Sequence, residues 1–295
     1  MRLSTSTCIY FNRPDGSKMD IRETIRACSK AGYRVMDMNF HDAAVFRTPF
    51  TGAGWKDWVY SLRETAEECG IVFSQSHSHF YNYTEESDGN AELEELVRRG
   101  IEGSAILGIP WTVIHAATDF RSAFTVRSSK EKGIRYFSEL SEYAARFGVG
   151  LAIENLWELN ISPQRRYTSS TEELLDLVEA IDAPNIGICW DVEHSSIMHQ
   201  DLKEAFRLVG DRLRCTHISD YVTIKHDHIL PYEGLSDWDS ILDAFAAIDY
   251  AGDFTYEVHR STMTLPDEAV PARLRYSVEL GERMLEEIER RRKPS

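Results

Sequence analysis

An apolar run at residues 186–194, with the sequence IGICWDVEH, ends on three ionisable residues, Asp191, Glu193 and His194. Ionisable side chains are costly to bury, so a buried strand that ends on three of them indicates a chemical role for its end. The three-residue spacing of Asp191 and His194 lets a strand end and the following turn bring a carboxylate and an imidazole to one point. Such a pair forms half of a divalent-metal site.

Further groups of this kind follow the other apolar runs of the chain, and of the ten histidines only His199 lies away from such a run end. The remaining groups are Asp37 and His41; His77 and His79; His115; Glu154 and Asn155; His217 and Asp220, with His226, Asp227 and His228 in the next loop; and Glu257, His259 and Arg260. Any one histidine could serve packing or a turn, but packing alone would not place nearly all of them at run ends.

The elements that position these residues alternate along the chain. Hydrophobic spacing and glycine stops predict strands at 4–11, 33–40, 71–80, 111–115, 149–154, 186–194, 212–219 and 253–259, and helices at 20–30, 55–69, 91–107, 130–147, 171–181, 201–208, 238–248 and from 271 onward. Strands that alternate with helices pair in parallel. Eight such units within 295 residues predict an α/β protein, a single (β/α)8 TIM barrel spanning 1–295. An open doubly wound sheet is the alternative, but the chain has no G-x-G-x-x-G phosphate loop.

Composition narrows the function. The net charge of −15 argues against a nucleic-acid binder, which would need a basic face. The five cysteines are odd in number and widely spaced, which predicts reduced thiols in a cytoplasmic protein. No run is long and apolar enough for a signal peptide or a membrane span, so we expect no membrane partner.

The order of the motifs resembles a known family. Glu154–Asn155, the W-D-x-x-H at 190–194, the H-x-x-D at 217–220 and Glu257 are similar to the pattern of the xylose isomerase-like barrel superfamily of sugar and sugar-phosphate isomerases and epimerases. The resemblance implies one divalent metal ion, Mn2+, Mg2+, Co2+ or Zn2+. Its implied ligands are Glu154, Asp191, His217 and Glu257.

The resemblance also implies the chemistry. The metal would polarise the carbonyl of a ketose, and Glu154 and Glu257 would move a proton through an enediolate. His194 would bond a substrate oxygen. We also expect substrate contacts from His79, His115, Lys225 and Arg260. The partner would be a small sugar or polyol, and a homodimer or tetramer is common in the superfamily.

Two alternatives stay open. Inosose dehydratase-like members of the superfamily use a similar metal site to eliminate water from a polyol. Endonuclease IV-like members cleave abasic DNA with three zinc ions, and residues near the positions of their extra ligands are His79, His115, His194, Asp227 and His228. Asp227 and His228 are adjacent, however, whereas that branch has a D-x-H spacing, and the negative net charge disfavours duplex DNA.

Overall fold

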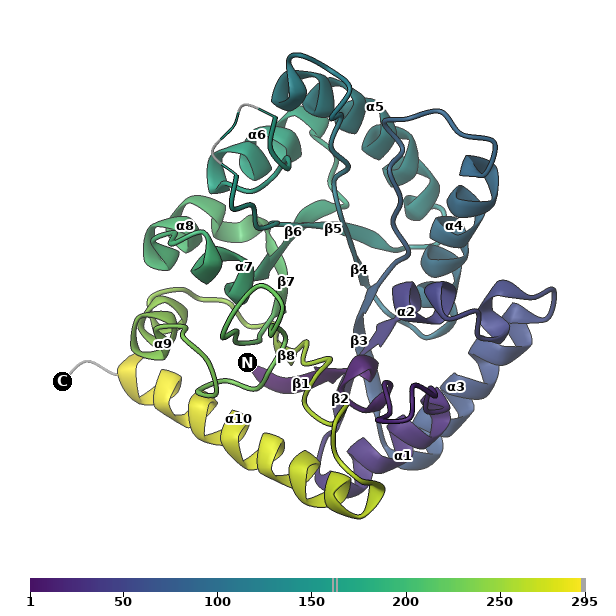
Figure 1. Cartoon of the computed structure of the whole chain (residues 1–295), viewed down its shortest axis with the longest axis vertical. Helices are drawn as coiled ribbons and strands as arrows, with labels where there is room; N and C mark the ends of the chain where they lie inside the picture. Colours follow the sequence, from purple (N-terminus) through teal and green to yellow (C-terminus); the bar gives the residue numbers. More distant parts are fainter. Residues whose placement is uncertain (161, 163, 293–295) are drawn as a thin grey trace.

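A computed structural model describes residues 1–160, 162 and 164–292 of the chain, and it has eight parallel strands in a ring with helices outside (Figure 1). The strands are β1 (Arg2–Ser6), β2 (Val35–Asn39), β3 (Val72–His77), β4 (Trp111–Ile114), β5 (Gly150–Glu154), β6 (Ile186–Asp191), β7 (Leu213–His217) and β8 (Asp253–Tyr256). The helices are α1 (Ile21–Ala31), α2 (Phe40–Val45), α3 (Trp55–Cys69), α4 (Asn90–Ile106), α5 (Thr125–Ala145), α6 (Thr171–Ile181), α7 (Val192–Ile197), α8 (Leu202–Val209), α9 (Trp238–Ala246) and α10 (Val270–Arg292). The strand order, β7-β6-β5-β4-β3-β2-β1-β8, confirms the predicted (β/α)8 barrel.

Most of the predicted strands end earlier than expected, and the ends of β1 and β6 show the physical reason. β1 ends at Ser6, whose hydroxyl accepts the backbone N–H of Cys8 and opens a 3₁₀ turn at Thr7–Tyr10. β6 ends at Asp191, whose side chain accepts the backbone N–H of His194 at 2.7 Å and caps α7. His194 therefore lies on a short helix and not on the strand.

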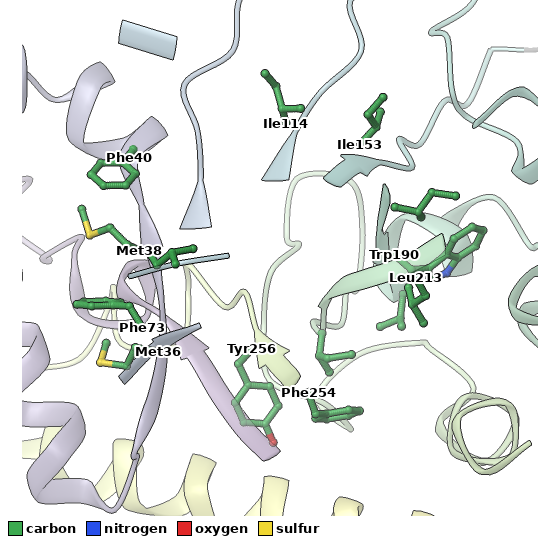
Figure 2. Packing of buried hydrophobic residues seen from close by; sticks show 14 of the residues in the cluster. Met36, Met38, Phe40, Phe73, Ile114, Ile153, Trp190, Leu213, Phe254 and Tyr256 are labelled. Atoms are coloured by element: carbon green, nitrogen blue, oxygen red, sulfur yellow. The ribbon is translucent and has the colours of Figure 1, made fainter. Parts of the chain in front are cut away.

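The main hydrophobic core lies between the strands and the surrounding helices. Figure 2 shows part of it, with Met36, Met38 and Phe73 on the left and Trp190 and Leu213 on the right. Trp190 is fully buried and meets the ring of Phe206 at a centroid distance of 6.0 Å. Within the described residues, no helix combines the length and apolarity needed to cross a membrane.

The interior of the barrel has an apolar part and a polar part. Four small residues, Val113, Ala152, Cys189 and Cys215, form a separate buried cluster. All five cysteines are free thiols, as predicted. The polar part contains Gln75, whose amide donates to the backbone carbonyl of Thr216 at 3.4 Å and accepts the Thr255 hydroxyl at 3.2 Å.

The barrel closes between β7 and β8 through few backbone bonds. The N–H of Ile218 donates to the Thr255 carbonyl at 2.8 Å, and the N–H of Glu257 donates to the Ile218 carbonyl at 3.1 Å. One step closer to the strand starts, the Thr216 hydroxyl donates to the Asp253 carbonyl at 2.6 Å. A side chain thus completes the closure directly beneath the strand ends.

Replacing Thr216 with valine keeps its shape and removes this hydroxyl. We expect the free energy of unfolding, measured by urea titration, to fall by about 1–2 kcal/mol because a buried carbonyl loses its bond. Thr112→Val is the matched control: its hydroxyl accepts from Ser76, which also bonds Ser104, so its loss should be smaller. Equal losses in the two variants would contradict a special role for Thr216 in closing the barrel.

Candidate active site

Four strand ends bring together the residues Glu154, Asp191, His217 and Glu257. They end β5, β6 and β7 or follow β8 directly. One nitrogen or oxygen atom from each lies within 4.8 Å of the others, and all four residues are buried. Parallel strands of a barrel end at one face, which explains the convergence. These are the four residues that the sequence analysis predicts as metal ligands.

The atoms of this cluster face one another. Nδ1 of His217 lies 3.0 Å from Oε1 of Glu154 and 3.3 Å from Oε2 of Glu257. Oδ1 of Asp191 is occupied by the α7 cap, whereas its buried Oδ2 has no hydrogen-bond partner. One oxygen of Asp191 is therefore directed at the cluster with nothing to bond it.

The electrostatics of the cluster favour a bound cation. Burial, with the nearby Glu154 charge, raises the pKa of Asp191 to about 7. Burial also acts to raise the pKa of Glu154 and Glu257, but the neighbouring histidines together outweigh it and hold both pKa values well below the usual range: His217 and His115 beside Glu154, and His217, His259 and His228 beside Glu257. Three buried carboxyl groups thus lie around His217, an arrangement that further positive charge would stabilise. Carboxylate oxygens with one imidazole fit a divalent ion such as Mn2+, Mg2+, Co2+ or Zn2+.

Two further histidines contact the outer oxygen of Glu154. Oε2 lies 2.8 Å from Nε2 of His115 and 3.3 Å from Nε2 of His77, and the two nitrogens are 3.2 Å apart. His115 is predicted above as a substrate-binding residue, and the structure places it against Glu154. The sequence analysis did not include His77 among the site residues. A signal was present in the sequence: His77 lies two residues before His79, so in an extended segment both side chains point to the same face.

A second group of three lies beside the cluster. Nδ1 of His194 donates to the Asn155 carbonyl at 2.8 Å, which leaves Nε2 of the neutral ring as an acceptor. Glu193, which the sequence analysis noted at the end of the apolar run but gave no site role, is fully buried, and burial raises its pKa to about 7. Its Oε2 accepts the backbone N–H of His228 at 2.7 Å. Ligand atoms of Glu193, His194 and His228 approach closely enough to hold a cation.

The other predicted substrate contacts lie in different surroundings. His79 is buried against His41, with a ring distance of 5.1 Å, and burial lowers its pKa to about 4. Arg260 pairs with Asp227 at 3.0 Å. Lys225 is exposed on a tight turn, and the structure does not bring it to the cluster. Substrate contacts by these residues stay predictions.

The comparisons with known proteins place this geometry in a family. A family model described as xylose isomerase-like TIM barrel matches residues 25–280. The chain belongs to this family. The xylose isomerase-like resemblance drawn from the strand-end motifs is thereby confirmed.

Three relatives illustrate the family's range. The uncharacterized protein y4fM of Sinorhizobium fredii is 29% identical over 178 residues, and the match spans 59% of this chain and 55% of y4fM. The D-psicose 3-epimerase of Enterocloster bolteae is 25% identical over 245 residues, spanning 79% of this chain and 75% of that enzyme. The crystal structure of a D-tagatose 3-epimerase-like protein superposes with a TM-score of 0.74 at 18% identity, covering 98% of this chain and 99% of the other. The structural match establishes the shared fold.

In this xylose isomerase-like barrel, a divalent ion should stabilise the fold. We expect Mn2+ at about 100 times its Kd to add about 2.7 kcal/mol to the chelator-treated protein, which raises Tm by about 5 °C or more in a thermal melt. Asp191→Asn should abolish the increase. Asp253→Asn, which removes a buried carboxylate paired with Arg2 at the start of β8, should lower Tm yet keep the Mn2+-dependent increase. An increase that survives in Asp191→Asn would place the ion elsewhere.

Proposed function

We propose that this protein is a divalent-metal-dependent isomerase or epimerase of a ketose or related polyol. The observation that carries the proposal is the convergence of two buried glutamates, Glu154 and Glu257, on Asp191 and His217 at the barrel's strand ends. The similarity to a D-psicose 3-epimerase supports a ketose as the substrate class.

The two glutamates approach from well-separated parts of the ring. Glu154 ends β5 and Glu257 follows β8, and β6 and β7 lie between them in the sheet on one side. A substrate held between them has one carboxylate available to each face. One glutamate takes the proton from the carbon next to the carbonyl, and the other returns a proton to the opposite face, which inverts that carbon. A bound divalent ion would polarise the carbonyl and so make this C–H more acidic.

Neighbouring side chains prepare the glutamates and the substrate. The His115 ring bonds the outer oxygen of Glu154 and so fixes the orientation of that carboxylate. His194 presents its unprotonated Nε2, which accepts a hydrogen bond from a substrate hydroxyl. Burial of this site excludes water, which strengthens each of these interactions.

Replacing Glu154 or Glu257 with glutamine removes a proton-transfer group with little change in shape. We expect kcat for the true ketose to fall by about 10²–10⁴-fold in each variant. A panel of ketoses in deuterated water, followed by NMR, measures both turnover and exchange at the carbon beside the carbonyl. Loss of substrate with appearance of a dehydrated product would instead support the lyase alternative.

The matched control is Glu94→Gln. Glu94 is a half-buried glutamate on α4 that accepts the hydroxyls of Tyr81 and Tyr136, away from the cluster. The kcat of the Glu94→Gln variant should equal that of the wild type. Full turnover by either Glu154→Gln or Glu257→Gln would refute the two-glutamate mechanism.

A second candidate function is metal-assisted cleavage of abasic DNA. The observation that favours it is the presence, among the described residues, of three further possible cation sites that share residues with the four-residue cluster or lie beside it: His77–His115–Glu154, Glu193–His194–His228 and His228–Glu257–His259. The net charge of −15 counts against it, since duplex DNA attracts basic surfaces.

Metal content per chain separates the two functions. Elemental mass spectrometry of the purified protein should find about one divalent ion per chain for the epimerase. About three zinc ions per chain, with nicking of an abasic duplex that a chelator stops, would favour the phosphodiesterase. If the protein is the phosphodiesterase, His115→Asn should lower the zinc count by about one. If it is the epimerase, the same His115→Asn variant should keep its single ion.

A further inference from the structure

Polar atoms without partners lie inside the barrel beneath the cluster. Asp37, in the middle of β2, is fully buried, and neither of its carboxyl oxygens has a hydrogen-bond partner in the described part of the chain. The same is true of Nε2 of His217 and of the hydroxyl oxygen of Ser4. Unpaired buried polar groups are costly, so several of them in one interior call for a shared explanation.

These atoms belong to inward-facing side chains. Asp37 is in register with Ser6 on β1, and Ser4 shares the face of Ser6 because side chains alternate along a strand. Burial raises the pKa of the Asp37 carboxyl, and the His217 ring is the strongest opposing influence. Gln75, the residue of β3 in register with Asp37, reaches across the interior and donates to the backbone carbonyl of Thr216, the residue before His217. The interior face of β2 at Asp37 and the end of β7 therefore border the same polar space.

The ring of His217 has two different environments. Nδ1 faces Glu154 and Glu257, where a cation fits, and a nitrogen that binds a metal must be unprotonated. Nε2 then carries the proton and points away from the cluster. A metal-binding histidine usually donates this second N–H to a carboxylate, a carbonyl or a water, which fixes its orientation. The Cys189 thiol also lies beside the ring, but it is buried and neutral, because burial raises its pKa.

We propose that Asp37 is a positioning residue for His217 and acts through a buried water that bridges its carboxyl to Nε2. A buried water makes about three hydrogen bonds, and Asp37, His217 and Ser4 supply a suitable set. The water accepts the Nε2–H and donates to the Asp37 carboxyl. This keeps Nδ1 of His217 unprotonated and aimed at the cluster.

This inference rests on the proposed function, because it needs a metal at the cluster. It also explains why a strand should carry a fully buried carboxyl with no direct partner. As a purely structural group, Asp37 would destabilise the fold, since a buried carboxyl without a bond costs free energy. A polar group retained at such a cost points to a role in the site above it.

Metal binding tests the proposal independently of activity. Mn2+ is titrated calorimetrically into chelator-treated wild type, Asp37→Asn and Asp37→Leu, and the Co2+ absorption spectrum reports ligand geometry. We expect Mn2+ affinity to fall by about 10-fold in Asp37→Asn and about 100-fold in Asp37→Leu. The urea midpoint of the metal-free protein should change little in Asp37→Asn, because the amide oxygen can still accept a hydrogen bond from the bridging water.

Ser76→Ala is the matched structural control. Ser76 is a fully buried residue on the neighbouring strand β3, and it bonds Ser104 and Thr112 on the helix side. The Ser76→Ala substitution should lower the urea midpoint and leave Mn2+ affinity and the Co2+ spectrum unchanged. Asp37→Asn with wild-type Mn2+ affinity, or with a lowered midpoint of the metal-free protein, would overturn the proposal while the proposed function stands. Wild type that binds no Mn2+ would overturn both.

Discussion

The structure depends on the burial of three carboxyl groups around one imidazole. Glu154, Asp191 and Glu257 meet at His217 where water has little access, and their mutual repulsion is relieved only by positive charge. The surrounding histidines supply part of that charge, and the proposed divalent cation would supply the rest. The fold tolerates the cluster because the eight strands of the barrel hold these side chains in place against their repulsion.

Two parts of the barrel interior, one apolar and one polar, support the buried cluster. One part is closely filled by small apolar residues, which gives the strands a firm contact below the cluster. The other part is polar, and there Gln75 and Thr216 make side-chain bonds at the closure between β7 and β8. Glu257 follows β8 directly, so the same closure determines how far its carboxyl reaches over the barrel. The closure between β7 and β8 therefore affects both the stability of the barrel and the geometry of the site.

The fold and the clustering of the strand-end residues could be predicted from the sequence, because strand ends converge in a parallel barrel whatever the details of the loops. Once β5, β6 and β7 were placed, Glu154, Asp191 and His217 had to share one face. Features beyond the strand ends could not be predicted. The burial of Glu193 depends on the short helix that Asp191 caps. The exposure of Lys225 depends on a tight loop turn, and neither feature has a periodic signal in the sequence.

The cap of α7 has a consequence for the choice of ion. Because one Asp191 oxygen is bound to the backbone of the helix, the residue would offer a single free oxygen to a cation and so act as a monodentate ligand. Ca2+ prefers six to eight oxygen ligands and often takes carboxylates in bidentate fashion. A site with a monodentate aspartate and an imidazole discriminates against Ca2+ in favour of smaller ions that keep positions open for other oxygens. A helix cap, ordinarily a matter of local stability, would here contribute to metal selectivity.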